Sequence, residues 1–304
     1  MDIKNFIENQ RSELQNKIDM SRYGEEYFEE VIIEGLYDLS ADNFTIVTES
    51  IGEKFVEIKD KLIKKIKELA IKFKNWVLNL IRNIELNCKT GKMIVNKYKS
   101  QIEEQYKKRA SKIKIRSKKY KLDVDNVYNV WDTIFDAVEK SIDGHTEELN
   151  TYKAEIEITG QGRINVINNN GALNTENLIK VVNSFYYDDD GEVKERLLQD
   201  AIRLETIISV LENTKMVVKN SKKSINKYNS MLKEHLAEIN NMKEEDFNSK
   251  EEFNNCIKNT TTAVKLYTAM GIFFVKQDMR IFKELYKFSQ QISKKLLNLK
   301  EMKE

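Results

Sequence analysis

Apolar residues recur at steps of three and four along most of the chain, and this pattern predicts long amphipathic helices. The clearest case runs from Ile51 to Ile84. Its apolar positions share one helical face: Phe55, Ile58, Leu62, Ile66, Leu69, Phe73, Val77, Leu80 and Ile84. Similar patterns continue through 89–121, 192–239 and 254–299. Because the last two are joined by a short connection, we expect them to form an antiparallel helix pair.

A strand pattern stands out in one place. Residues 155–158 and 163–166 alternate apolar and polar side chains, and Gly160 and Gly162 lie between the two runs. Alternation around a glycine-containing turn predicts a β-hairpin near 154–167. The predicted fold is therefore mainly α, a bundle of long helices with one small β-hairpin insertion.

The composition agrees with a helical bundle and excludes several other classes. The 304 residues include no Pro and only 10 Gly, so collagen-like, Pro-rich and Gly-linker proteins are excluded. Two cysteines, Cys88 and Cys256, cannot make a disulfide framework, which favours a reducing compartment. Neither a signal-peptide pattern nor an apolar run of about 18 residues is present, so we expect a soluble protein.

Charge divides the chain into three predicted segments. Residues 1–53 form an acidic N-terminal segment with a net charge of −9. Residues 54–121, the predicted basic amphipathic helices, carry +16, and residues 122–304, the predicted bundle with the hairpin, carry −5. Charge blocks of this size indicate the kind of partner rather than the fold.

No catalytic or metal-binding motif emerges from the sequence. The two histidines, His145 and His235, stand in no triad pattern, and the cysteines form no CxxC pair. Thr90–Met93 lacks the residues of a phosphate loop, and Asp188–Gly191 fails as a calcium loop. We therefore expect a protein that is not an enzyme and needs no metal or cofactor. A pair of catalytic carboxylates among the 49 acids stays open.

The basic segment supplies the candidate binding residues for nucleic acid or another anionic surface. They are Lys61, Lys64, Lys65, Lys72, Lys74, Lys107, Lys108, Arg109, Arg116, Lys118 and Lys119. Four interpretations stay open: a solvated face around a packed helix, contacts with phosphates, binding to an anionic membrane through Phe73 and Trp76, and a charge clamp with the acidic segment.

One family resemblance adds to these expectations. The acidic segment leads through Val47–Gly52 into a Lys-, Ile- and Trp-rich helix. This layout, over about residues 30–85, resembles the internal head and virion structural proteins of large tailed bacteriophages. The Lys-, Asn- and Ile-rich, Pro-free composition also suits a phage of an AT-rich host.

The resemblance implies a non-enzymatic structural protein of the virion that is made in the bacterial host cytoplasm. It implies partners among other virion proteins or further copies of this chain, non-specific contact with DNA, and a propeptide removed after Glu49. A membrane surface is the lesser partner. Two alternatives remain: a membrane-active helical protein, such as a toxin or lysis factor, and an unrecognised enzyme or host-takeover factor.

Overall fold

The structure is a computed structural model of the whole chain. It describes residues 52–121, 155–158, 162–167 and 173–298, together with parts of 32–44 and 132–136. All statements below concern these residues.

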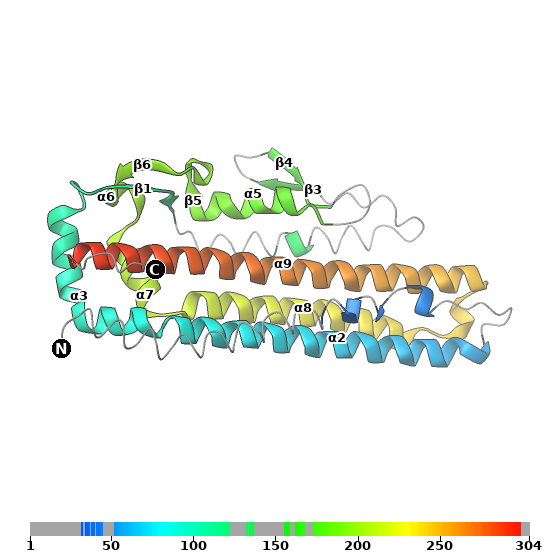
Figure 1. Cartoon of the computed structure of the whole chain (residues 1–304). Coiled ribbons are helices and arrows are strands. Elements are labelled where there is room, and N and C mark those ends of the chain that lie inside the picture. The colour runs from blue at the N-terminus through cyan, green and yellow to red at the C-terminus, as the bar shows by residue number, and fades with distance from the viewer. Residues whose placement is uncertain are drawn as a thin grey trace.

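Three long helices lie side by side and confirm the predicted mainly α fold (Figure 1). They are α2 (Gly52–Asn87), α8 (Lys215–Asn241) and α9 (Lys250–Leu296). Helix α8 contacts both of the others and runs antiparallel to them. The predicted antiparallel pair is therefore α8 and α9.

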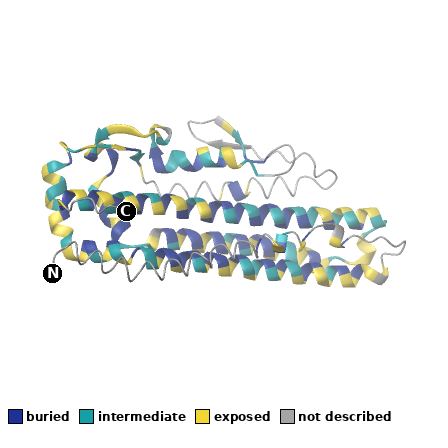
Figure 2. Ribbon diagram, viewed as in Figure 1, coloured by how far each residue is buried: buried dark blue, intermediate teal, exposed yellow. Residues whose placement is uncertain are grey.

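The core forms where the apolar faces of these helices meet (Figure 2). The Phe73 ring of α2 is fully buried, and its centroid lies 4.3 Å from that of Tyr228 on α8. Gly271 of α9 lies against the same ring, since a Cβ added there would stand 2.8 Å from the Phe73 Cζ atom. The absence of a side chain at Gly271 therefore allows α9 to approach α2 closely.

The two ends of the bundle differ in structure. At one end, the Lys59 Nζ atom donates hydrogen bonds to the carbonyl oxygens of Asn240 and Met242, at 2.7 and 2.8 Å, just where α8 ends. A short 3-10 helix, η4 (Glu244–Asp246), then leads towards α9. At the other end, α3 (Lys89–Arg109) turns away from α2, as Figure 1 shows.

The remaining elements lie along or beside α9. Helix α5 (Thr175–Tyr186) is capped by the Asn174 side chain, which accepts a hydrogen bond from the Asn177 backbone at 3.2 Å. The other short helices are η1 (Ala41–Phe44), η3 (Asp189–Gly191), α6 (Leu198–Ala201) and α7 (Leu204–Glu212). Strands β3 (Glu155–Ile158) and β4 (Gly162–Asn165) pair antiparallel, which confirms the predicted hairpin.

Two predicted helical runs are interrupted by strands. The run 89–121 is helical only to Arg109, and then forms β1 (Lys114–Ser117) and β2 (Lys119–Tyr120). These strands pair antiparallel with β6 (Lys194–Leu197) and β5 (Tyr187–Asp188), respectively. The run 192–239 is likewise divided among β6, α6, α7 and α8. Each pairing joins distant segments, so local periodicity could not predict it.

The proposed division of the chain at residues 53 and 121 stays a prediction. The apolar spacing of residues 124–138 also predicts an amphipathic helix, but this segment lies largely outside the described residues, although Ile134–Asp136 are helical.

Candidate functional site

The basic side chains of α2 project from two different flanks. On one flank, Lys65 forms an ion pair with Asp38, at 2.9 Å, and lies 3.7 Å from Glu68. On the same flank, the Lys61 Nζ atom donates to the Asn43 carbonyl oxygen at 3.2 Å. This flank of the basic helix therefore faces a described part of the acidic N-terminal segment.

Electrostatics at this contact follow from the ion pair. The hydrogen bond from Lys65 is the main cause that lowers the pKa of Asp38, and the charge of Lys72 adds to it. The same hydrogen bond raises the pKa of Lys65. Both side chains keep substantial contact with solvent, so the pair contributes little to stability. It is one contact of the kind that a charge clamp within the molecule would require.

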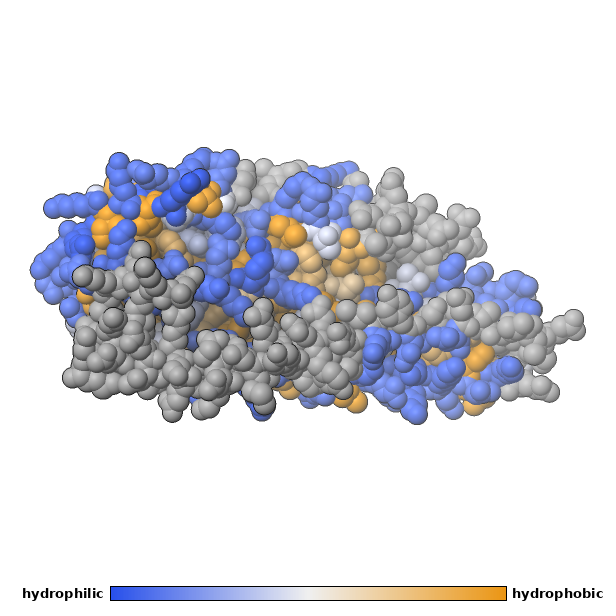
Figure 3. Space-filling view, in the orientation of Figure 1, coloured by the Kyte–Doolittle hydropathy of each residue, from blue (hydrophilic) through white to orange (hydrophobic). Residues whose placement is uncertain are grey.

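A neighbouring flank of α2, which faces away from the buried side of the helix, displays cations to solvent. Lys64 and Lys74 are exposed and make no ion pair with any described residue. Two further exposed cations, Lys67 and Arg82, share this flank. Neither is among the candidate binding residues that were chosen from the sequence. Their spacing could have found them, because positions three, four or seven apart share a helical face. In Figure 3, hydrophilic side chains dominate the visible part of α2.

The aromatic residues considered for membrane contact lie in the core. Phe73 and Trp76 are 0% and 1% exposed, respectively, and their ring centroids are 5.8 Å apart. Within the described part of the chain, no helix has both the length and the apolar character needed to cross a bilayer. The folded structure thus presents neither aromatic side chain to a membrane.

A second group of cations lies at the end of the molecule, where α3 leads into β1. Lys107, Lys112 and Arg116 are exposed and form no ion pair with a described residue. Lys108 pairs with Glu104, and the Arg109 guanidinium donates to the Asn298 Oδ1 atom at 2.7 Å. We call Lys107, Lys112 and Arg116 the end surface.

An open pocket of about 370 Å³ adjoins the end surface. It is lined by Tyr106, Lys107, Ala110, Ser111, Gln199, Arg203, Leu204 and Glu205. One wall is fixed by Tyr106, whose hydroxyl donates to the Ile202 carbonyl oxygen at 2.7 Å. The charged lining residues are Lys107, Arg203 and Glu205, so the lining carries a net positive charge.

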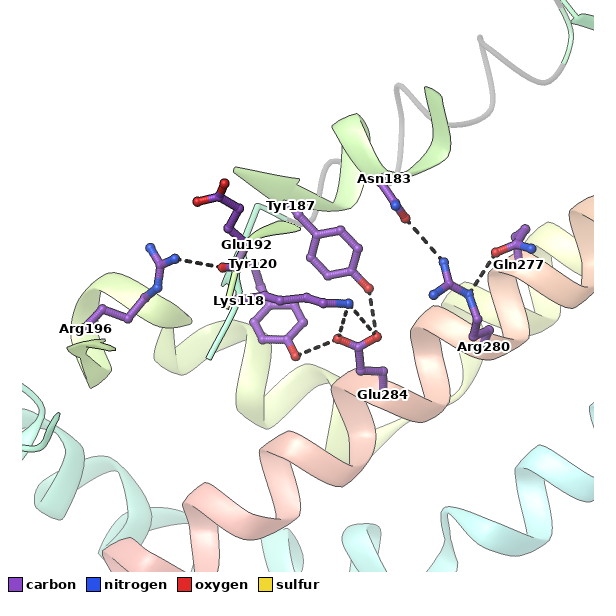
Figure 4. A network of polar contacts seen from close by, with 9 residues as sticks. All are labelled: Lys118, Tyr120, Asn183, Tyr187, Glu192, Arg196, Gln277, Arg280 and Glu284. Carbon is purple, nitrogen blue, oxygen red and sulfur yellow. Dashed lines mark hydrogen bonds and ion pairs between the residues drawn. The ribbon is translucent and has the colours of Figure 1, made fainter. Parts of the chain in front are cut away.

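Lys118 and Lys119, by contrast, form ion pairs with acids from other elements of the fold. The Lys118 Nζ atom lies 3.0 Å from a carboxylate oxygen of Glu284 on α9 (Figure 4). The hydroxyls of Tyr120 and Tyr187 donate to the same carboxylate, each at 3.1 Å. Burial, chiefly, raises the pKa of both tyrosines, so both stay protonated donors. Lys119 pairs with Asp188 at 2.9 Å, across β2 and β5.

Asp278 of α9 is a buried carboxylate that the sequence analysis did not single out. The Tyr186 hydroxyl of α5 donates to its Oδ1 atom at 3.0 Å, and the Asn220 side chain of α8 is its second polar neighbour. Burial raises the pKa of Asp278 to about 7. Its place in the helical repeat was the available clue, because it follows Phe274 and Val275 of the buried face by four and three residues.

The described residues offer little for metal or nucleophilic chemistry. They contain no group of three or more His, Cys, Asp or Glu side chains that could hold a metal ion. Burial raises the pKa of Cys88 to about 12, which leaves it an unreactive thiol at neutral pH. The His235 Nδ1 atom lies 2.9 Å from Glu238, and the His235 ring stacks on the buried Tyr267 ring, so its side chain is only 12% exposed. Glu49 and His145 lie outside the described residues.

No protein family, curated protein or solved structure matches the chain in sequence or structure comparisons. The most distinctive property of the described surface is its set of exposed cations on α2 and at the end surface.

We predict that Asp278 makes stability depend on pH. Its pKa is raised in the folded state, so between about pH 4 and pH 7 the folded chain holds a proton that the unfolded chain releases. The free energy of unfolding should therefore fall as pH rises through this window. Asp278→Asn should remove this loss and be more stable at pH 8 by roughly 2–4 kcal/mol.

Urea unfolding from pH 4 to pH 8 measures the effect. Asp60→Asn, at an exposed position of α2, is the matched control and should follow the parent chain. Parallel pH curves for the Asp278 variant and the parent would show that Asp278 is not the titrating group.

Proposed function

We propose that this protein is a non-enzymatic structural component of a bacteriophage particle, associated with the head, and that its basic surface binds DNA without sequence specificity. The proposal combines the sequence resemblance with one structural observation. That observation is the end surface, where Lys107, Lys112 and Arg116 are exposed and form no ion pair with a described acid.

Charge balance supports a polyanionic partner. Residues 105–121 include nine Lys and Arg and no acid. The acids that reach this segment come from elsewhere and pair with some of its cations: Glu104 with Lys108, Glu195 with Lys114, Glu284 with Lys118, and Asp188 with Lys119. A cationic surplus therefore remains at the end of the molecule, and DNA phosphates are a natural counterpart for it.

The form of the end surface favours contact with phosphates over readout of bases. Its three cations follow one another closely along the chain. Lys107 lies in the last turn of α3, Lys112 in the turn that follows, and Arg116 in β1. Phosphate contacts by such long side chains position a protein on DNA without reading its sequence. Binding of this kind should be strongly salt-dependent.

A DNA titration tests the proposed binding. The parent chain should bind a random-sequence duplex at low salt, and log affinity should fall linearly with log salt. Substituting Lys107→Glu, Lys112→Glu and Arg116→Glu together removes three phosphate contacts, so the slope should become shallower by about 2–3. Fluorescence anisotropy at several salt concentrations measures both quantities.

The matched control carries Lys215→Glu, Lys219→Glu and Lys222→Glu, the same change of charge at exposed positions of α8. It should retain most of the salt dependence of the parent. Equal losses in the two triple variants would assign binding to net charge rather than to the end surface, and salt-independent binding would contradict the proposal.

The virion location has its own test. Mass spectrometry of purified particles of the encoding phage should recover the chain, and removal of the propeptide after Glu49 would give a peptide beginning at Ser50. Recovery only from the host lysate, with none in purified particles, would contradict a structural role in the virion.

A further inference from the structure

The solvent-facing flank of α2 combines charge with apolar surface. Six exposed positions follow one another at steps of three and four: Lys64, Lys67, Ile71, Lys74, Leu78 and Arg82. Steps of this kind keep the side chains in line along one face of a helix. We call these six residues the outer stripe. At 1.5 Å per residue the stripe is about 27 Å long.

The aliphatic members of the outer stripe are exposed to an unusual degree. Ile71 is 59% exposed and Leu78 is 42% exposed, although most of the large apolar residues of α2 are buried. They stand seven residues apart, which is the repeat of a helix-packing seam. Two aliphatic side chains aligned in this way can pack against a second helix laid along α2.

The cationic members of the outer stripe lack partners within the described structure. The side chains of Lys64, Lys67, Lys74 and Arg82 make no ion pair or hydrogen bond with a described residue. Between Lys64 and Arg82 the sequence holds a single acid, Glu68, and this residue lies 3.7 Å from Lys65 on the other flank. The charge of the stripe is therefore uniformly positive along its length.

These two properties select among the surfaces that could cover the stripe. A DNA backbone would pair with the cations but leave Ile71 and Leu78 in water. A second copy of the stripe would place cations against cations, which is repulsive. A bilayer surface needs a broad apolar face, and the broad apolar face of α2 is already packed in the core.

We propose that the outer stripe is a docking surface for an acidic amphipathic helix of a partner protein. The aliphatic residues of that helix pack between Ile71 and Leu78, while its flanking carboxylates pair with the four cations. This recognition uses helix-to-helix packing for affinity and opposite charge for orientation and partner choice. The surface lies on the side of the bundle and is distinct from the end surface proposed to bind DNA.

A designed peptide tests this proposal. The probe is a labelled helical peptide of about 21 residues, a length that matches the outer stripe. It carries Leu in a heptad seam, Glu beside the seam and Ala elsewhere. A second peptide has the same composition in an order that gives no apolar face. The full-length parent chain should bind the first peptide and bind the second at least about tenfold more weakly.

Three variants locate the binding surface. Lys67→Glu with Lys74→Glu should weaken binding of the first peptide by about tenfold or more, because two attractions become repulsions. Ile71→Gln with Leu78→Gln should weaken it by about three- to tenfold through lost apolar contact. The control, Lys219→Glu with Lys222→Glu on α8, should bind like the parent.

Several results would overturn the proposal. One is equal binding of the two peptides, since charge alone would then account for it. Another is unchanged binding by the Ile71 and Leu78 variant. Failure of the parent to bind the first peptide would also overturn it, as would a larger effect of the stripe variants on duplex DNA, on anionic phosphatidylglycerol vesicles or on self-association measured by sedimentation. Circular dichroism confirms that each variant is folded.

Discussion

The packing of the Phe73 ring against Gly271 and Tyr228 fixes the rotation of α2, and the display of its basic side chains depends on that rotation. The ring fills the space that a side chain at Gly271 would need. Turning α2 about its axis would withdraw the ring and bring cations towards the core, at a high desolvation cost. Dense apolar packing on one side of the helix is thus what holds Lys64 and Lys74 in solvent on the other.

The same helix shows why net charge by itself is a poor guide to a binding surface. All its lysines belong to one basic block of sequence, yet their surroundings differ. Lys59 donates to carbonyl oxygens at the end of α8, and Lys65 pairs with Asp38, whereas Lys64, Lys67, Lys74 and Arg82 form no ion pair with a described residue. The candidate binding surface therefore consists of the cations that make no contact within the described structure.

Local sequence pattern predicted the elements whose partners lie nearby or whose own periodicity is strong. The apolar repeat of α2 and α9 and the alternation in β3 and β4 are visible in the residues themselves. Strands β1 and β2 are short and rich in Lys and Arg, and their pairing with β6 and β5 depends on residues far along the chain. Their strand conformation is a tertiary effect that overrides the local helical preference.

The candidate site was predictable to a similar degree. The basic block pointed to the right region, and helical spacing could also have found Lys67 and Arg82. Sequence could not show that Lys118 would pair with Glu284, which lies 166 residues away, together with two tyrosines. It could not show the hydrogen bond between Asp278 and Tyr186 either, because that contact requires α5 to pack on α9.

Chemical labelling of lysines tests most directly which lysines are held in contacts within the fold and which are exposed to solvent. Brief acetylation of the native chain, followed by mass spectrometry of its peptides, gives a rate for each lysine. Lys64, Lys67, Lys74, Lys107 and Lys112 should react fastest, whereas Lys59, Lys65 and Lys118 should react several-fold more slowly and catch up after denaturation. Equal rates for the two groups in the native chain would contradict the proposed display of a basic surface.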